Sequence, residues 1–152
     1  MRGRGGGAVE FRTVASERER FLDLLLLADE EETMIARYLD RGEMIALYDG
    51  GLRGVCVVTN EGEGLYELQN IAIVPEHRGR GYGRALILHV LDRYRGQGVL
   101  QVGTGGCTAA FYASCGFEVS HTLKNYFAEH YSRPIIEDGV RLLDKVYLKR
   151  AL

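Results

Sequence analysis

The chain has 152 residues, a length that predicts one domain, and its 46% hydrophobic and 26% charged residues are typical of a globular protein. Nineteen basic and twenty-one acidic residues give a net charge of −2, which excludes the positive surface of a general nucleic-acid-binding protein. No apolar run reaches the roughly 18 residues of a membrane span, so we expect no membrane partner. The three cysteines are odd in number and lack metal-ligand spacing. We therefore expect reduced thiols, a cytoplasmic protein and no bound metal.

Glycine is in excess, with 20 residues against two prolines, and half of the glycines lie in three clusters. The first cluster belongs to residues 1–8, which we expect to be a flexible tail, so that the domain runs from 9 to 152. Arg2 and Arg4 leave RNA contact open as an alternative role for this tail, which its deletion and the salt dependence of binding would test.

Hydrophobic patterns predict the elements in order from the N-terminus. Residues 9–14 alternate between apolar and polar and predict a first strand. Ser16 and Glu19 form a capping box, which predicts the start of a short helix. Asp29 and Glu32 repeat this start signal before a second apolar stripe, so a second helix follows.

A meander of three strands comes next. Asp49-Gly50-Gly51 is a tight-turn signal between the apolar runs 44–48 and 55–59, and therefore predicts a hairpin. The stretch 65–74 predicts a long third strand that ends at Pro75.

The second half of the chain alternates helices with short strands. From residue 81 the apolar spacing becomes helical and ends near 96. We then expect a strand at 99–102, a helix at 108–114, a strand from 117, a helical turn at 125–131 and a final strand at 140–148.

The second glycine cluster lies where a strand runs into a helix. Its glycines alternate with basic and aromatic residues: Arg78, Gly79, Arg80, Gly81, Tyr82, Gly83 and Arg84. The first amides of a helix lack internal partners, and glycine lets the backbone approach a ligand closely, so this turn predicts an anion site. A tight turn with solvated arginines is the alternative. A dinucleotide fingerprint is not met, because Arg84 stands in place of its third glycine and the next strand ends in Gly103-Thr104.

The spacing Arg78-x-x-Gly81-x-Gly83 resembles the signature of the GNAT superfamily of acetyl-CoA-dependent N-acetyltransferases. The resemblance extends from about Val9 to Leu148. Ile71-Ala72-Ile73-Val74-Pro75 is similar to the family's approach to this signature, and Phe111-Tyr112-x-x-Cys115-Gly116-Phe117 to a late family element. It implies an α/β (α+β) fold, with a mixed, mostly antiparallel sheet of about six to seven strands flanked by about four helices and splayed between the fourth and fifth strands.

The resemblance also implies where acetyl-CoA binds. Its pyrophosphate would lie on the backbone amides from Arg78 to Arg84. Its pantetheine arm would bind main-chain groups of Ile71, Ala72 and Ile73, where a bulge would part this strand from the next. Ordinary core packing of these three side chains is compatible with that role.

Two side chains become catalytic candidates by the same resemblance. Tyr112 matches the tyrosine that donates a proton to the departing thiolate, with core packing as its alternative role. Glu67 stands where family members take the proton from the amine, and strand alternation places it on one face with Gln69, beside a wet cleft. An exposed strand glutamate is the alternative. Glu31, Glu32 and His130 are weaker candidates for the base.

One position departs from the family pattern. Many members have an asparagine seven residues before the catalytic tyrosine, and this chain has Gly105 there. Either the backbone at Gly105 and Gly106 replaces the missing group, or the segment is a simple loop. The sequence does not identify the acceptor amine, so small-molecule acceptors and protein or peptide acceptors both stay open. A homodimer also stays open. An acyl-CoA-binding regulatory module without turnover is the alternative function.

Overall fold

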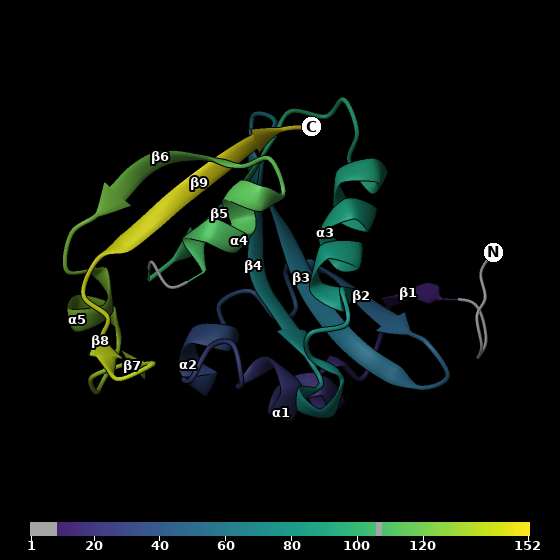
Figure 1. The fold of residues 1–152 in the computed structure, drawn as a ribbon, viewed down its shortest axis with the longest axis horizontal. Helices are drawn as coiled ribbons and strands as arrows, with labels where there is room; N and C mark the ends of the chain where they lie inside the picture. The colour runs from purple at the N-terminus through teal and green to yellow at the C-terminus, as the bar shows by residue number, and fades with distance from the viewer. Residues whose placement is uncertain (1–8, 106–107) are drawn as a thin grey trace. The chain divides into compact units, whose positions relative to one another are not determined.

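The structure is a computed structural model, and it describes residues 9–105 and 108–152. Seven strands form one sheet in the order β1-β2-β3-β4-β5-β9-β6 (Figure 1). These strands are β1 (Glu10–Val14), β2 (Glu43–Tyr48), β3 (Leu52–Gly62), β4 (Leu65–Ile73), β5 (Val99–Thr104), β6 (Glu118–Leu123) and β9 (Lys145–Ala151). Strands β4 and β5 are parallel, whereas the pairs β1–β2, β2–β3, β5–β9 and β6–β9 are antiparallel. The expected mixed, mostly antiparallel sheet is confirmed.

The helices are short apart from one. They are η1 (Arg18–Phe21), α1 (Leu22–Leu25), α2 (Glu32–Ile35), η2 (Pro75–His77), α3 (Tyr82–Arg93), α4 (Ala109–Ser114) and α5 (Tyr126–His130). A second sheet pairs β7 (Ile136–Glu137) with β8 (Val140–Arg141). None of the helices within 9–105 and 108–152 has the length and apolar character that crossing a bilayer requires.

The described chain divides into two compact units. The first contains the residues up to Thr59 together with Gln69–Arg93, and the second contains Asn60–Leu68 together with Tyr94–Leu152. Strands β3 and β4 each begin in one unit and end in the other.

In the first unit, β2 and β3 are covered on both faces. Residues of one face pack into a core with η1, α1, α2 and the segment after α2. Its buried members are Val14, Phe21, Leu25, Ile35, Tyr38, Met44, Ala46, Val55, Val57 and Ala72. The other face meets α3, because a Cβ at Gly54 would lie 3.2 Å from Leu86 Cδ1 and 2.7 Å from Ile73 Cδ1. This double cover explains why β2 is apolar at successive positions instead of alternating.

In the second unit, β5, β9 and β6 form an antiparallel group, and α4 contacts both β9 and β6 (Figure 1). The backbones of Gly64 and Gly98 lie in close contact. Val99 N donates to Gly64 O at 2.8 Å, and a Cβ at Gly98 would lie 1.9 Å from that oxygen. Only glycine fits at this contact, which aligns the start of β5 with the start of β4.

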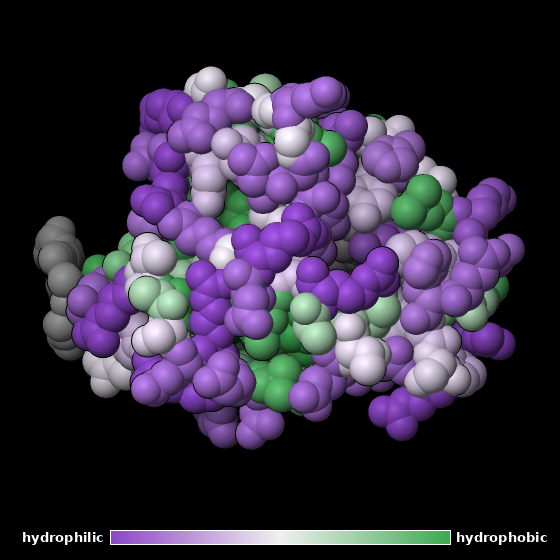
Figure 2. Space-filling view, turned by 180° about the vertical axis from the view of Figure 1, so that it is seen from behind, coloured by the Kyte–Doolittle hydropathy of each residue, from purple (hydrophilic) through white to green (hydrophobic). Residues whose placement is uncertain are grey.

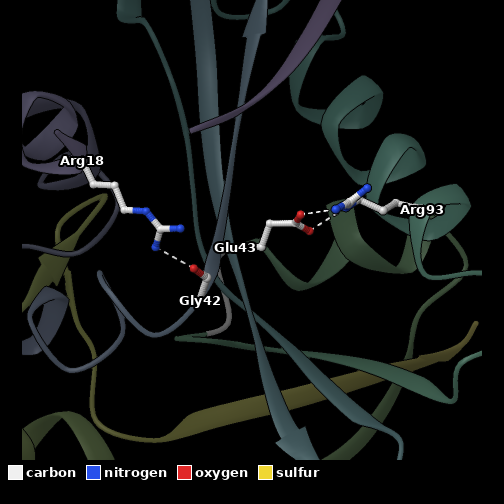
Figure 3. Close-up of polar contacts among 4 residues, drawn as sticks. All are labelled: Arg18, Gly42, Glu43 and Arg93. Carbon is white, nitrogen blue, oxygen red and sulfur yellow. Dashed lines mark hydrogen bonds and ion pairs between the residues drawn. The ribbon is translucent and has the colours of Figure 1, made fainter. Parts of the chain in front are cut away.

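The predicted capping box at the first helix is wrong. Glu17 precedes η1 in a left-handed conformation, with φ of 54°, and no side chain caps this end. The guanidinium of Arg18 donates to the carbonyl oxygen of Leu39 at 2.7 Å. It also donates to the carbonyl oxygen of Gly42 at 2.6 Å (Figure 3). The expected local hydrogen bond of Ser16 is thus absent, and Arg18 binds this region through long-range contacts instead.

The second predicted helix start is also shifted. Helix α2 begins at Glu32, with Glu31 as its extended N-cap residue, and not at Asp29. The Asp29 carboxylate instead accepts a hydrogen bond from the hydroxyl of Tyr38. A second long-range link joins β2 to the end of α3, where Arg93 Nε donates to Glu43 Oε1 at 2.6 Å (Figure 3).

The final strand is interrupted, so the expectation of one strand over 140–148 is wrong. β8 ends at Arg141 and β9 begins at Lys145. Between them Leu142 is buried and its N–H donates to Ile135 O, while Asp144 Oδ1 accepts from the N–H of Asn125. Both contacts lie in the break between the two strands.

Hydrophilic residues cover most of the face seen in Figure 2, and hydrophobic residues gather there only in small groups. A large contiguous apolar area marks a docking surface, and this face does not present one.

Candidate functional site

The glycine-rich turn lies in the first unit, between the end of β4 and the start of α3. Gly79 has φ of 77° and Gly81 has φ of 86°, conformations that side chains disfavour. A Cβ on either glycine would have no atom of the described residues within 4 Å, so the space in front of both is open. The turn fits a group that lies directly against the backbone, as a phosphate does at a helix N-terminus.

The electrostatic field of this turn is positive. Arg78, Arg80 and Arg84 have exposed side chains, and the first turn of α3 contains no acidic residue that would offset its dipole. Arg80 Nη1 lies 3.1 Å from Nδ1 of His77. Partial desolvation, followed by the positive charges of Arg53 and Arg80, lowers the pKa of His77 from its ordinary value. A bound polyanion would be stabilised by this field.

Tyr82 and Gly83 begin α3. The Tyr82 hydroxyl donates to Asp49 Oδ2 at 2.6 Å, so this side chain is fixed to the β2–β3 hairpin while its backbone starts the helix. The predicted cofactor residues from Arg78 to Arg84 are therefore one continuous turn and helix start.

Ile71, Ala72 and Ile73 are the last three residues of β4. The parallel ladder with β5 runs from the pair Leu65–Val99 to the pair Leu68–Val102 and ends there. The three residues lie beyond that ladder, which is the expected splay between the fourth and fifth strands. Ala72 is buried, whereas Ile71 and Ile73 are half-buried. The bulge and the binding of pantetheine stay predictions.

Glu67 lies in the second unit and is only 6% exposed, so the alternative of an exposed strand glutamate is wrong. Its two oxygens have separate partners: Gln101 Nε2 donates to Oε1 at 2.7 Å, and the Tyr147 hydroxyl donates to Oε2 at 3.2 Å. Burial, and then the charge of Glu67, raises the pKa of Tyr147 well above its ordinary value, so Tyr147 remains a donor. The structure thus holds this carboxylate in one orientation.

Gln69, the residue expected on the same face as Glu67, belongs to the first unit. Its side-chain amide donates to Thr59 Oγ1 at 3.0 Å. Its polar group is therefore held by β3.

Tyr112 lies on α4 in the second unit and is 7% exposed. Its ring meets Phe111 and Phe117 edge to face, with centroids 5.3 Å and 5.9 Å away. Its carbonyl oxygen accepts from the N–H groups of Cys115 and Phe117, and Gly116 takes the left-handed conformation that closes the helix. Packing fixes the ring, and the role of the hydroxyl stays a prediction.

Gly105 has a packing explanation. A Cβ at this position would lie 2.5 to 3.0 Å from three side-chain atoms of Leu142, so an asparagine would not fit without displacing a buried leucine. Leu142 therefore occupies the space that a side chain at position 105 would need. Gly106, named with it in the sequence analysis, lies outside the described residues.

The weaker candidates for the base have local surroundings of their own. Glu31 and Glu32 mark the start of α2. The ring of His130 stacks on Tyr126, with centroids 4.3 Å apart, and its Nδ1 lies 2.9 Å from the carbonyl of that tyrosine. In the part of the chain that the structure describes, no three His, Cys, Asp or Glu side chains gather as a metal site would need.

Sequence reasoning missed three polar residues of this region: Gln101, Tyr147 and Asn70. Gln101 is opposite Glu67 in the parallel register. A glutamine inside the apolar run from Val99 to Val102 could have indicated a buried polar contact, since a buried amide needs a hydrogen-bond partner. Asn70 gives the same kind of signal within β4. Tyr147 gives none, because tyrosine is common on strands.

Comparison with known proteins agrees with this geometry. A family model of the acetyltransferase (GNAT) domain matches residues 40–119. The uncharacterized N-acetyltransferase YvbK of Bacillus subtilis is 31% identical over 136 residues, which are 86% of this chain and 88% of that protein.

Solved structures show the same fold. An IAA acetyltransferase from Bacillus cereus is 33% identical with a TM-score of 0.86, over 95% of this chain and 100% of that one. A Bacillus subtilis acetyltransferase in complex with CoA is 29% identical with a TM-score of 0.87, over 95% and 99%.

Proposed function

Because the chain belongs to the GNAT acetyltransferase family, we propose that it transfers the acetyl group of acetyl-CoA directly to a primary amine. The observation that carries this proposal is the open, positively charged glycine turn at the start of α3. A relative whose structure contains CoA supports the choice of cosubstrate.

In this proposal the backbone amides from Arg78 to Arg84 hold the pyrophosphate. Gly79 and Gly81 leave the backbone uncovered, and the arginines add charge around it. Main-chain groups of Ile71, Ala72 and Ile73 orient the pantetheine arm, which supplies the reactive thioester. Orientation of this kind accounts for much of the rate of a bimolecular transfer.

Glu67 takes the proton that the amine has to lose. An alkylamine with a pKa near about 10.4 is almost wholly protonated at neutral pH, so transfer needs a base. Each carboxylate oxygen of Glu67 accepts one hydrogen bond from the protein, and a carboxylate has about four acceptor sites in all. The group therefore keeps capacity for a proton, directly or through a water.

Tyr112 donates a proton to the departing thiolate. Its ring is fixed between two aromatic neighbours on α4 and after it, so the hydroxyl is held in position. Positioned proton donors of this kind contribute about 10² to 10⁴ in rate.

The test measures release of the CoA thiol from acetyl-CoA. The acceptors are spermidine, lysine and a peptide with an N-terminal alanine. We expect turnover with at least one of them, and a loss of about 10² in kcat for Tyr112→Phe, with the Kd for CoA unchanged. Tyr66→Phe is the matched control, since it removes a hydroxyl that bonds only outward to Gln97 among the contacts described for it.

Two results would contradict the proposal. Binding of CoA without turnover on any amine would favour an acyl-CoA-binding regulatory module. Absence of CoA binding would remove both functions.

A further inference from the structure

A lysine is held between two aromatic rings in the second unit. Lys145 begins β9, and its Nζ lies 4.4 Å from the ring centroid of Tyr126 on α5 and 5.1 Å from that of Tyr147. Both distances are within the range of a cation–π contact. An aromatic ring attracts a cation but carries no formal negative charge, so these two contacts fix the ammonium without neutralising it. The neighbouring carboxylate of Asp144 is directed at the backbone, where Oδ1 accepts from the N–H of Asn125 at 2.8 Å.

The third glycine cluster provides the path of this lysine. Gly103 lies on β5 and is paired with Tyr147 on β9. A Cβ at Gly103 would lie 2.2 Å from Lys145 Cε and 3.1 Å from its Cδ. The lysine stem therefore crosses β5 at a position where the strand has no side chain, and the position of the ammonium depends on this glycine.

Tyr147 connects the ammonium to the proposed base. Lys145 contacts its ring, and its hydroxyl donates to Glu67 Oε2 at 3.2 Å. The register agrees, because Glu67 is opposite Gln101 and Gly103, two residues further along β5, is opposite Tyr147. Residues directly opposite each other, and residues two apart on a strand, share one face of a sheet. The positive and the negative group are thus separated by a single tyrosine side chain on one face of the second unit.

This face reaches the surface at its lysine end. Lys145 and Tyr126 are half-buried. His121, whose ring stacks on Tyr147 with centroids 4.8 Å apart, is exposed. The ammonium is therefore accessible from solvent, and Glu67 at the other end keeps an exposed fraction of 6%.

We infer that Lys145 selects the acceptor: its ammonium binds a carboxylate group on the molecule whose amine meets Glu67. This role of Lys145 rests on the proposed function of Glu67 as the base. An amine at Glu67 leaves the far end of the acceptor beside a fixed positive charge, which attracts a carboxylate and repels a second ammonium. The two rings that would otherwise attract a cationic ligand already hold the lysine. The acceptor class is therefore an amino-carboxylate and not a polyamine.

The test compares three amines that share a four-carbon chain and differ at the far end. That end is anionic in 4-aminobutanoate, neutral in n-butylamine and cationic in 1,4-diaminobutane. Thiol release from acetyl-CoA gives kcat and KM for each. We expect kcat/KM to be about tenfold higher for 4-aminobutanoate than for n-butylamine, mainly through KM, and lowest for 1,4-diaminobutane. Equal values for the three amines, or the reverse order, would overturn the inference.

Two variants test whether the preference comes from the lysine. Lys145→Met removes the charge and keeps most of the stem, so the preference for 4-aminobutanoate over n-butylamine should disappear. Gly103→Ala keeps the charge, but its methyl group meets the lysine stem and displaces the ammonium, so the preference should decrease. Lys124→Met is the matched control, because it removes the same charge from an exposed residue directly after β6. A preference that survives in Lys145→Met, or that decreases equally in Lys124→Met, would overturn the inference.

Calorimetric titration with 4-aminobutanoate in the presence of CoA separates this inference from the proposed function. Binding that Lys145→Met weakens, without thiol release from acetyl-CoA, would refute the function and keep the site. Thiol release with the same kcat/KM for all three amines would refute the site and keep the function.

Discussion

Glu67 shows how burial changes the meaning of a residue. On an exposed strand a glutamate is a solvated charge with little chemical consequence. Here it is held by Gln101 and Tyr147, which come from strands β5 and β9. A carboxylate with two fixed donors keeps one orientation, and a base needs such an orientation to meet a proton at hydrogen-bond distance.

Glu67→Gln is the corresponding prediction. The amide keeps the shape of the side chain but has no basic group, so we expect kcat/KM for the amine to fall about 10²-fold. Thiol release measured over a range of amine concentrations checks this fall. Glu63→Gln, at an exposed turn, is the control, and an unchanged kcat/KM in Glu67→Gln would remove Glu67 from the mechanism.

At the scale of elements, the junction between β4 and α3 combines a strand end, a 3-10 turn and a helix start. Only local features are needed to build it: Pro75 ends the strand, and positive φ at Gly79 and Gly81 turns the backbone. The open space in front of both glycines is combined here with three exposed arginines and a helix start, and this combination distinguishes the junction from an ordinary turn.

Gly81→Ala tests that distinction. The added methyl group meets no atom of the described residues within 4 Å but enters the space proposed for the pyrophosphate, and the left-handed backbone makes it unfavourable by about 1 to 2 kcal/mol. We expect CoA affinity, measured by calorimetry, to fall at least about tenfold.

Gly62→Ala is the matched control for Gly81→Ala. Gly62 has φ of 94°, and an added Cβ there would meet no atom of residues 9–105 and 108–152 within 4 Å, but Gly62 lies outside the glycine-rich turn. Both variants should lose similar stability in urea, and only Gly81→Ala should lose CoA affinity. An equal loss of affinity in both would mean that general destabilisation, and not the turn, is responsible.

At the scale of the whole molecule, the stability of the fold should depend on alkaline pH through Cys56. Complete burial in β3 raises the pKa of this thiol to about 12, with a further contribution from the charge of Glu43. An unfolded thiol ionises near about pH 8.5. Since the native state holds the proton longer, stability is complete below that pH and falls as the pH rises toward 12.

The expected loss from this thiol between pH 8 and pH 9.5 is about 1 kcal/mol in the free energy of unfolding. Urea unfolding at the two pH values measures it, and both values lie below the ordinary tyrosine pKa of about 10. Cys56→Ala should show a smaller decrease than the unaltered chain, even though it starts from a lower stability. Identical decreases in both would show that Cys56 ionises equally easily in the folded protein.

Much of the fold could be predicted from patterns within short windows. The hairpin around Asp49-Gly50-Gly51, the long strand to Pro75 and the helix that follows the glycines occur where the pattern predicts them. The elements that failed are those whose residues have distant partners. The expected cap at Ser16 does not form, whereas Arg18 binds carbonyl groups 21 and 24 residues away. The last strand is broken beside Asp144, which accepts a hydrogen bond from Asn125, 19 residues away.

The sequence by itself determined the glycine turn, because φ preferences and the start of a helix are properties of adjacent residues. Only the tertiary structure decided what surrounds the polar residues. Asn70 meets groups 32 and 45 residues away, Glu67 meets groups 34 and 80 residues away, and Gly105 is constrained by Leu142. Such partners depend on strand order and register, which join distant segments and leave no periodic trace in any one of them.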